Sequence, residues 1–207
     1  SLITTDAAVS QPVLQHALRK IADCTYNRVS VDGDTSVCDM TVAMANGMAG
    51  NACIESTDSE DYFLFEEAMH TVCEYLARLL AKDGEGATKL LEVNVIHAAE
   101  KSQAYQIACA VAKSPLVKTA MFGEDANWGR IITAAGYSGA DFDPNKIDIY
   151  IGSVITCRNG CAVDFDEAAA LEVLRRDEVV ITVDMKAGDA SDHMWTCDFS
   201  YDYVKIN

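Results

Sequence analysis

The stretch VVITVDM, residues 179–185, decides the class of fold more clearly than any other part of the sequence. Apolar side chains occupy alternate positions in it, which is the pattern of a β-strand with one buried face. The stretch WTCDFSYDY, residues 195–203, repeats this alternation, and Ala187-Gly188-Asp189 lies between the two. Glycine and aspartate favour turns, so the pattern predicts an antiparallel pair of strands near the C-terminus.

Helical periodicity dominates the N-terminal part of the chain. Ser10 is a candidate N-cap, and apolar residues then recur at helical spacing as far as Ile21. Thr57 and Glu60 have the spacing of a capping box. The apolar stripe behind them ends near Asp83-Gly84 and predicts the longest helix; its members are Phe65, Met69, Val72, Leu76, Leu79 and Leu80.

The remaining segments alternate between the two kinds of pattern. They predict strands at residues 26–31, 92–98 and 116–122, and helices near residues 37–49, 101–113, 127–136 and 166–175. Interleaved helices and strands indicate an α/β or α+β layered fold. The sequence has only three prolines and no Ser/Gly-rich linker, so we expect one domain.

Composition and charge exclude several classes of protein. The chain of 207 residues carries 32 Asp and Glu against 16 Lys and Arg, a formal net charge of −16. This charge disfavours nucleic acids and anionic membranes as partners. No stretch approaches the roughly 18 consecutive apolar residues of a membrane span, and the initial SLITTDAAVS has no basic region ahead of an apolar one. The sequence therefore predicts a cytoplasmic globular protein.

The eight cysteines indicate neither a disulfide framework nor a metal site. Without a signal peptide we expect reduced thiols, and the spacing contains no CxxC pair. Cys157 and Cys161 bracket Arg158-Asn159-Gly160, and Asn-Gly favours the tight turn of a hairpin. We interpret these cysteines as structural and predict no metal.

The loop DGEGATK, residues 83–89, is the first candidate for chemistry. It is not a P-loop, because the order GxxxxGK[ST] is absent. Glycines flank Glu85 at the end of a predicted helix, so its carboxylate could point into a cleft and pair with a substrate ammonium group. The alternative is an ordinary glycine cap followed by a surface glutamate.

Two further loops carry clusters of polar residues. GEDANWGR, residues 123–130, precedes a predicted helix, for which Asp125 or Asn127 would serve as N-cap. VDGDTS, residues 31–36, follows a predicted strand and opens another predicted helix, where anion binding competes with simple capping. The sequence contains no GxSxG elbow and no assignable Ser-His-Asp or Cys-His arrangement, so the residues alone do not define the reaction.

Several long motifs, taken in order, resemble those of one family. They are ITTDA (3–7), NRVSVDGDTS (27–36), NGMAG (46–50), DGEGATKL (83–90), SPLVKTAMFGEDANWGRI (114–131) and WTCDFSYDYVKIN (195–207). Together they resemble the ornithine acetyltransferase family, the bifunctional glutamate N-acetyltransferases of arginine biosynthesis. The resemblance covers essentially the whole chain, and a motif such as FGEDANWGR is long and specific.

The resemblance implies a precursor that cleaves itself before a threonine, with residues 1–207 as the C-terminal β chain. The new N-terminal threonine is then the nucleophile. Matching Thr4-Thr5-Asp6-Ala7 to the family pattern puts that threonine three positions before Ser1, so no catalytic residue is assigned within this sequence. The alternative is that Ser1 itself supplies an N-terminal hydroxyl.

The activity implied is acetyl transfer from N-acetylornithine to glutamate through an acetyl-enzyme, with the threonine's own α-amine as base. Whether acetyl-CoA is a second donor stays open; no cofactor or metal is implied. The family also implies a separate α chain that supplies oxyanion donors, an α2β2 heterotetramer, and a layered α/β sandwich of mixed sheets with helices on the outer faces, of the DmpA and ornithine acetyltransferase type.

Two substrate-binding residues follow from the matched motifs. Glu85 matches the acid of DGEGATK and is expected to hold the amino group of ornithine, and Asn207 matches the amide of YVKIN and is expected to be a second substrate contact. The sequence departs from the family pattern at Val37-Cys38, where Thr-Asn is usual. In the family a substrate-binding hydroxyl residue follows shortly after the matched asparagine.

Two rival interpretations remain at this point. A related self-cleaving amidase or aminopeptidase would pass the acyl group to water instead of glutamate. The chain would be a non-catalytic partner subunit if no nucleophile preceded Ser1.

Overall fold

The computed structural model describes all residues from 1 to 207 and divides into two compact units. Unit 1 contains residues 1–28 and 35–77, and unit 2 contains residues 29–34 and 78–207. One boundary between the units falls inside helix α2 (Glu60–Lys82), so no flexible linker marks it. The lack of a linker in the sequence therefore gave no sign of this division. That the whole chain forms one unit with a separate α chain stays a prediction.

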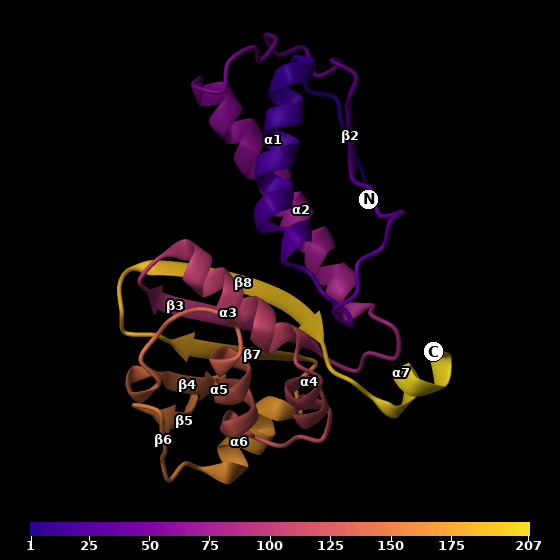
Figure 1. The fold of residues 1–207 in the computed structure, drawn as a ribbon. Helices are drawn as coiled ribbons and strands as arrows, with labels where there is room; N and C mark the ends of the chain where they lie inside the picture. The colour runs from indigo at the N-terminus through magenta and orange to yellow at the C-terminus, as the bar shows by residue number, and fades with distance from the viewer. The chain divides into compact units, whose positions relative to one another are not determined.

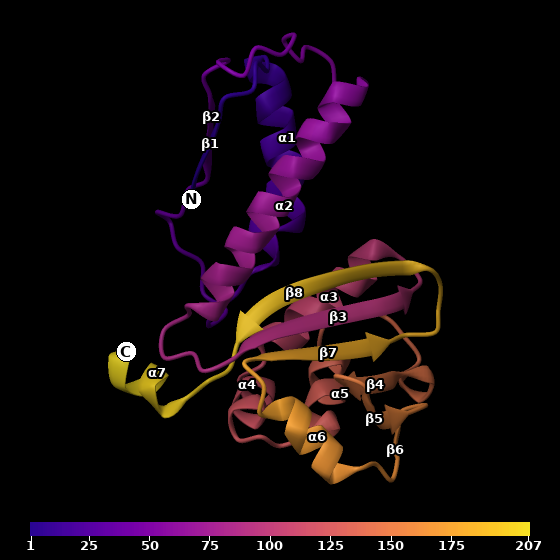
Figure 2. The same cartoon turned by 180° about the vertical axis from the view of Figure 1, so that it is seen from behind.

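Unit 1 combines a small sheet with two helices that lie side by side, α1 (Gln11–Cys24) and the first part of α2 (Figures 1 and 2). Strands β1 (Leu2–Thr5) and β2 (Val42–Ala45) pair in parallel. A core of buried side chains holds the unit together, made of Ile3, Val13, Ala17, Ile21, Ile54, Tyr62, Met69 and Cys73.

Two expectations for residues 26–49 are wrong. Residues 37–49 contain β2 instead of a helix, because Val42–Ala45 pairs with β1 and this tertiary contact overrides local propensity. Residues 26–31 begin with a short 3-10 helix, η1 (Tyr26–Arg28), and only Val29 makes a bridge, to Trp195. The helix predicted from Ser10 is confirmed as α1, although the Ser10 side chain makes no capping hydrogen bond.

Helix α2 is the longest helix, as predicted, with 23 residues. Its N-terminus is held by Ser59, whose Oγ accepts from the N–H of Tyr62 at 3.2 Å, and not by Thr57. The predicted apolar stripe is only partly buried, since Val72 is 49% exposed. The helix therefore carries a second apolar face that this chain leaves uncovered. No helix of the chain is both long and apolar enough to cross a membrane.

Unit 2 is built on a six-stranded sheet with the order β6-β5-β4-β7-β3-β8. Strands β3 and β7 are parallel, and every other neighbouring pair is antiparallel. The bounds are β3 (Leu90–Ala98), β4 (Asp148–Ile151), β5 (Val154–Arg158), β6 (Cys161–Ala162), β7 (Glu178–Asp184) and β8 (Ala190–Cys197). The predicted α/β fold with a mixed sheet is confirmed.

The C-terminal strands differ from the predicted hairpin. β7 and β8 are not neighbours, because β3 lies between them and pairs with both. The second strand ends at Cys197 and is followed by helix α7 (Tyr201–Ile206). The alternating pattern predicted that the strand would continue to residue 203. Instead Ser200 caps α7, since its hydroxyl accepts from the N–H of Asp202 at 3.1 Å.

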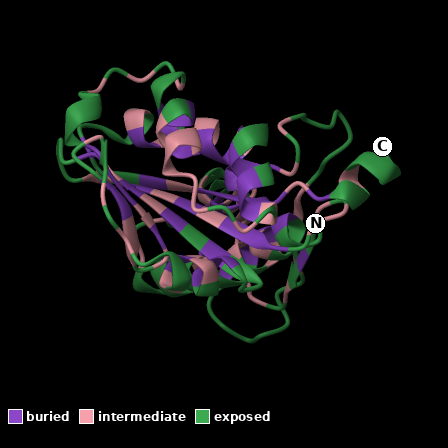
Figure 3. Ribbon diagram, turned by 90° about the horizontal axis from the view of Figure 1, so that it is seen from below, coloured by how far each residue is buried: buried purple, intermediate pink, exposed green.

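Helices α3 (Lys101–Lys113) and α5 (Trp128–Gly136) lie on one face of the sheet, in front of it in Figure 1 and behind it in Figure 2. Their apolar side chains join one large core with residues of β3, β4, β7, α4 and α6. Figure 3 shows this burial concentrated along the strands and the inner sides of the helices. Predictions at 101–113, 127–136 and 166–175 are confirmed by α3, α5 and α6 (Glu167–Leu174).

Residues 116–122 form helix α4 (Pro115–Phe122) and not the predicted strand. Ser114 caps it by accepting from the N–H of Val117, and Pro115 occupies the first helical position. These are start signals for a helix, and they outweigh the apolar run that suggested a strand.

The Asn-Gly turn is confirmed as a hairpin between β5 and β6. Asn159 and Gly160 both have positive φ, 49° and 71°, as this tight turn requires. The short 3-10 helix η2 (Pro144–Lys146) lies against it, since a Cβ at Gly160 would meet the backbone of Pro144.

Candidate functional site

The loop that carries Glu85 links α2 to β3. Its turn is closed by a hydrogen bond from the N–H of Ala87 to the carbonyl of Gly84 at 2.9 Å. Gly86 has φ of +66°, so a left-handed backbone conformation follows Glu85 directly. The glycines therefore shape a tight turn that presents Glu85 at its apex.

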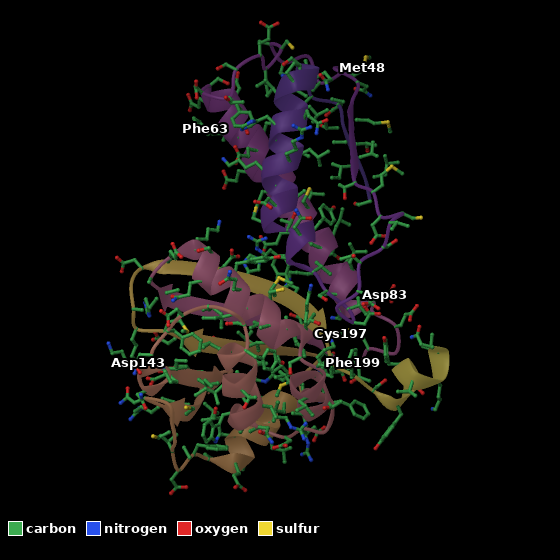
Figure 4. All side chains as sticks on the ribbon, viewed as in Figure 1. Met48, Phe63, Asp83, Asp143, Cys197 and Phe199 are labelled. Atoms are coloured by element: carbon green, nitrogen blue, oxygen red, sulfur yellow. The ribbon has the colours of Figure 1, made fainter.

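The C-terminal segment, residues 198–207, runs past this loop. Asp83 on the loop and Phe199 on the segment mark the two in Figure 4. Asn207 donates from Nδ2 to Oε2 of Glu85 at 2.7 Å. The structure therefore brings together the two residues that the sequence singled out, although 122 positions separate them.

The base of the segment is tied to the loop by Asp198, which is fully buried. Its Oδ1 accepts from the N–H groups of Thr88 at 2.8 Å and Lys89 at 2.9 Å, and its Oδ2 bonds the Thr88 hydroxyl at 2.5 Å. Farther along, the hydroxyl of Ser200 donates to the carbonyl of Gly86 at 2.5 Å. Asp198 was not predicted as a site residue, because the alternation of residues 195–203 indicates only a strand with one buried face.

A buried cation lies beneath the segment. The ammonium of Lys118, on α4, donates to the carbonyl of Cys197 and to the hydroxyl of Thr196 at 2.7 Å, and it lies 4.5 Å from the ring of Phe199. Burial lowers the pKa of Lys118, and burial likewise raises the pKa of Cys197. Phe199 stacks on Tyr203 with ring centroids 4.6 Å apart. This packing extends from α4 to α7.

The surroundings of Glu85 are acidic. The hydroxyl of Tyr203 donates to Asp32 Oδ2 at 3.3 Å. Desolvation, together with the carboxylates of Asp32, Glu85 and Asp34, raises the pKa of Tyr203. A negative potential at this position favours a cationic group over an anionic one.

The loop of residues 31–36 therefore contributes carboxylates and not the N-terminus of a helix. No helix follows it, which removes the anion site considered from the sequence. At the departure from the family pattern, the N–H of Cys38 donates to Ser36 Oγ at 3.0 Å, and the Val37 side chain is exposed.

The loop of residues 123–130 has a structural role in this chain. Asn127 caps α5 by accepting from the N–H of Arg130 at 3.1 Å, and it donates to Asp125 at 2.9 Å. Glu124 pairs with Arg175 at 3.0 Å. These contacts satisfy the polar groups of the loop locally, and none of them involves Glu85 or Asn207.

No group of three or more His, Cys, Asp and Glu side chains is arranged to hold a metal ion. A surface hollow of about 680 Å³ lies along α1, but its lining contains neither Glu85 nor Asn207. The candidate site is therefore the loop and the C-terminal segment, and what it offers is a pair of polar side chains in an acidic environment.

A solved chain has the same mixed-sheet α/β fold. It is a crystal structure of arginine biosynthesis bifunctional protein ArgJ from Bacillus halodurans, with a TM-score of 0.96 and 45% identity, covering 100% of this chain and 97% of that chain. The ArgJ family model matches residues 1–207. The chain belongs to the ArgJ family, which confirms the resemblance inferred from its motifs.

Curated relatives carry the same description. Arginine biosynthesis bifunctional protein ArgJ of Caldanaerobacter subterraneus subsp. tengcongensis is 54% identical over 211 residues, covering 100% of this chain and 52% of the relative. That of Geobacillus stearothermophilus is 49% identical, covering 100% of this chain and 50% of the relative. The chain thus spans about half the length of the curated relatives it matches.

Proposed function

We propose that this chain is the β chain of a self-cleaved acetyltransferase of arginine biosynthesis, which moves acetyl from N-acetylornithine to glutamate. The observation that carries the proposal is the contact between Glu85 and Asn207 within a member of the ArgJ family. A cytoplasmic location and an α2β2 assembly with a separate α chain are parts of the same proposal.

The site chemistry suits a substrate ammonium group. The Asn207 amide occupies Oε2 of Glu85, which leaves Oε1 of Glu85 and Oδ1 of Asn207 as acceptors for N–H donors. An ammonium group has three donors and a positive charge, and the nearby Asp32 carboxylate adds to the attraction. Ornithine carries such a group in its side chain.

The reaction follows from an N-terminal threonine that precedes Ser1. Its hydroxyl attacks the acetyl carbonyl of N-acetylornithine while its α-amine takes the proton, and the ornithine amine leaves with that proton. The glutamate amine then attacks the acetyl carbonyl, its proton passes through the α-amine to the threonine oxygen, and the bond between that oxygen and the acetyl group breaks to release N-acetylglutamate. Glu85 and Asn207 orient the donor, which lowers the entropic part of the barrier.

The extent of the comparisons supports a cleaved precursor. The chain spans about half of each curated relative, yet it covers 97% of the solved chain from Bacillus halodurans. A precursor that is cleaved into two chains of similar length would account for both numbers.

The exposed surface of unit 1 supports an α chain as partner. Leu64, Val72 and Tyr75 recur at helical spacing on α2 and are 60%, 49% and 64% exposed. The parallel pair β1–β2 has only two strands, whereas parallel sheets are larger and covered on both faces. The missing half of the relatives' length is the occupant that we propose for these surfaces.

Acetyl labelling tests the proposed reaction. The intact enzyme is incubated with N-acetylornithine labelled in the acetyl group, and the N-terminal peptide of the β chain is analysed by mass spectrometry. Label on an N-terminal threonine is expected, and cleaved, folded enzyme without label would refute the proposal. Release of acetate without dependence on glutamate would instead identify an amidase. A β chain without an N-terminal threonine would indicate a non-catalytic subunit.

The role of Glu85 has its own test. Glu85→Gln keeps the shape of the side chain but removes the charge, so KM for N-acetylornithine should rise about ten- to hundred-fold. Glu172→Gln is the matched control, since Glu172 is an exposed glutamate of unit 2 on α6. Equal kinetics in both variants would remove Glu85 from the site. Incubation of the enzyme with acetyl-CoA and glutamate, without N-acetylornithine, tests whether acetyl-CoA is a second donor, because N-acetylglutamate then forms only if it is.

The partner surface is tested by charge. Val72→Glu with Tyr75→Glu should abolish co-purification of the two chains, because charges cannot be buried without partners. Tyr137→Glu is the control, since Tyr137 is 60% exposed but lies in unit 2. Normal assembly of the double variant would refute this surface.

A further inference from the structure

We propose that Asp198 is a positioning residue, which sets the separation of Glu85 and Asn207 and thereby the preference of the site for a donor that carries an ammonium group. This inference rests on the proposed function. Asp198 does not itself contact Glu85 or Asn207, so it acts through the backbone that carries them.

The contacts of Asp198 join the loop to the C-terminal segment at one buried point. One carboxylate accepts two N–H groups and bonds one hydroxyl, all from Thr88 and Lys89, at 2.5–2.9 Å. The N–H of Asp198 also donates to the carbonyl of Lys89 at 3.4 Å. The carboxylate is therefore fully engaged, and both chain segments are fixed in one register.

From that point the two segments run in opposite directions and meet twice more. Ser200 bonds Gly86, and Asn207 bonds Glu85. Glu85 lies three residues before Thr88, so fixing Thr88 limits where the Glu85 carboxylate can lie. The contact between Asn207 and Glu85 is exposed, whereas the Asp198 side chain is buried and its contacts with Thr88 and Lys89 are part-buried or buried. Water therefore competes more strongly for the outer contact than for the inner ones.

Lys118 supplies a positive charge beside the buried Asp198 side chain. Its ammonium fixes the carbonyl of Cys197, the residue before Asp198, and attracts the Asp198 carboxylate. A cation on one side and three hydrogen bonds on the other replace the lost hydration of the carboxylate. These contacts hold the loop and the C-terminal segment in one geometry, and a site that discriminates between substrates requires such a fixed geometry.

The test compares two donors in the intact enzyme with both chains. N-acetylornithine carries the side-chain ammonium group, and N-acetylnorvaline has a side chain of the same carbon length without it. Wild type should prefer the first. Asp198→Ala should lower kcat/KM for N-acetylornithine about ten- to hundred-fold and leave N-acetylnorvaline nearly unchanged. A merely structural role would lower both values together and would overturn the inference.

Two further variants keep the test decisive. Asp198→Asn retains an oxygen that accepts both N–H groups, so it should keep most of the preference. Thr88→Val removes only the hydroxyl contact and should reduce the preference by a smaller factor than Asp198→Ala, so it carries the test if Asp198→Ala does not fold. Wild-type preference in a folded Asp198→Ala, or in Thr88→Val where Asp198→Ala does not fold, would overturn the inference.

The outcomes separate this inference from the proposed function. Wild type that does not transfer acetyl from N-acetylornithine contradicts the proposed function itself. A different set of results contradicts only the role of Asp198. In it, the wild type transfers acetyl and prefers N-acetylornithine, Glu85→Gln loses that preference, and Asp198→Ala keeps it.

Discussion

Replacing Gly86 by alanine tests whether close packing between the loop and α7 holds the candidate site together. A Cβ at Gly86 would lie 2.8 Å from the carbonyl carbon of Asp202 and 2.9 Å from Cα of Tyr203. Both are backbone atoms and cannot rotate away. The backbone nitrogen of Tyr203 would lie closer still, so, because ordinary contacts begin at 3.4 Å, the methyl group must move α7 from the loop by more than about 0.6 Å.

The expected cost has two parts. Alanine at positive φ loses about 1 kcal/mol. Separation of the two segments also weakens the hydrogen bonds of Gly86 to Ser200 and of Glu85 to Asn207, each contributing about 0.5–1.5 kcal/mol. Gly86→Ala should therefore cost about 2–4 kcal/mol. Gly139→Ala is the matched control and should cost only about 1 kcal/mol, because Gly139 has φ of +83° with no atom within 4 Å.

Hydrogen exchange of the intact enzyme, measured by mass spectrometry, reports the separation directly. Amides of α7 should exchange about ten- to hundred-fold faster in Gly86→Ala than in wild type, and those of Gly139→Ala should not change there. KM for N-acetylornithine should rise only in the first variant. If both variants leave α7 equally protected, close packing at Gly86 does not hold the site and the reasoning is refuted.

Three further predictions concern the stability of unit 2. Burial acts to raise the pKa of Asp148, but hydrogen bonds from Lys186 at 2.6 Å and the N–H of Asn159 at 2.8 Å outweigh it and leave the pKa lowered. The resulting stability is present above about pH 4 and is lost as pH falls through the folded-state pKa of Asp148. In Asp148→Asn the free energy of unfolding should therefore depend less on pH below about pH 4. Arg78→Ala should destabilise by about 1 kcal/mol and alter Trp195 fluorescence, because Arg78 pairs with Glu92 and lies 5.9 Å from the Trp195 ring; Arg78→Lys should change the emission less. Ser114→Ala should lose about 1 kcal/mol in urea unfolding by removing the cap of α4, and an unchanged midpoint would contradict that role.

Local patterns predicted those elements whose signals are contained in the segment itself. The periodicity of residues 101–113 and the Asn159-Gly160 turn are examples, since helix propensity and positive φ are properties of the residues present. Strand β2 could not be predicted this way, because it exists through pairing with β1. The order of β7, β3 and β8 is likewise a long-range property, which alternation in the segments does not contain.

The candidate site was foreseen in part. Motif resemblance singled out Glu85 and Asn207 as substrate-binding candidates, and the structure places them in contact, while their binding of substrate stays a prediction. Asp198 was not identified, because the same alternating pattern fits an exposed strand residue and a buried one. Only the approach of Thr88 and Lys89, far away in sequence, gives its carboxylate partners. A buried polar side chain is thus hard to recognise before its partners are known.

The position of β3 in the sheet has a consequence for folding during synthesis. Leu90, at its start, pairs with Glu178 on one side and Cys197 on the other, so β3 has no strand partner until 178 − 90 = 88 more residues have been made. At about 5–20 residues per second, this delay is roughly 5–20 s. Helix α3 forms meanwhile and packs on Val93 and Val95, which shields the apolar face of a strand whose edges are still open to other chains.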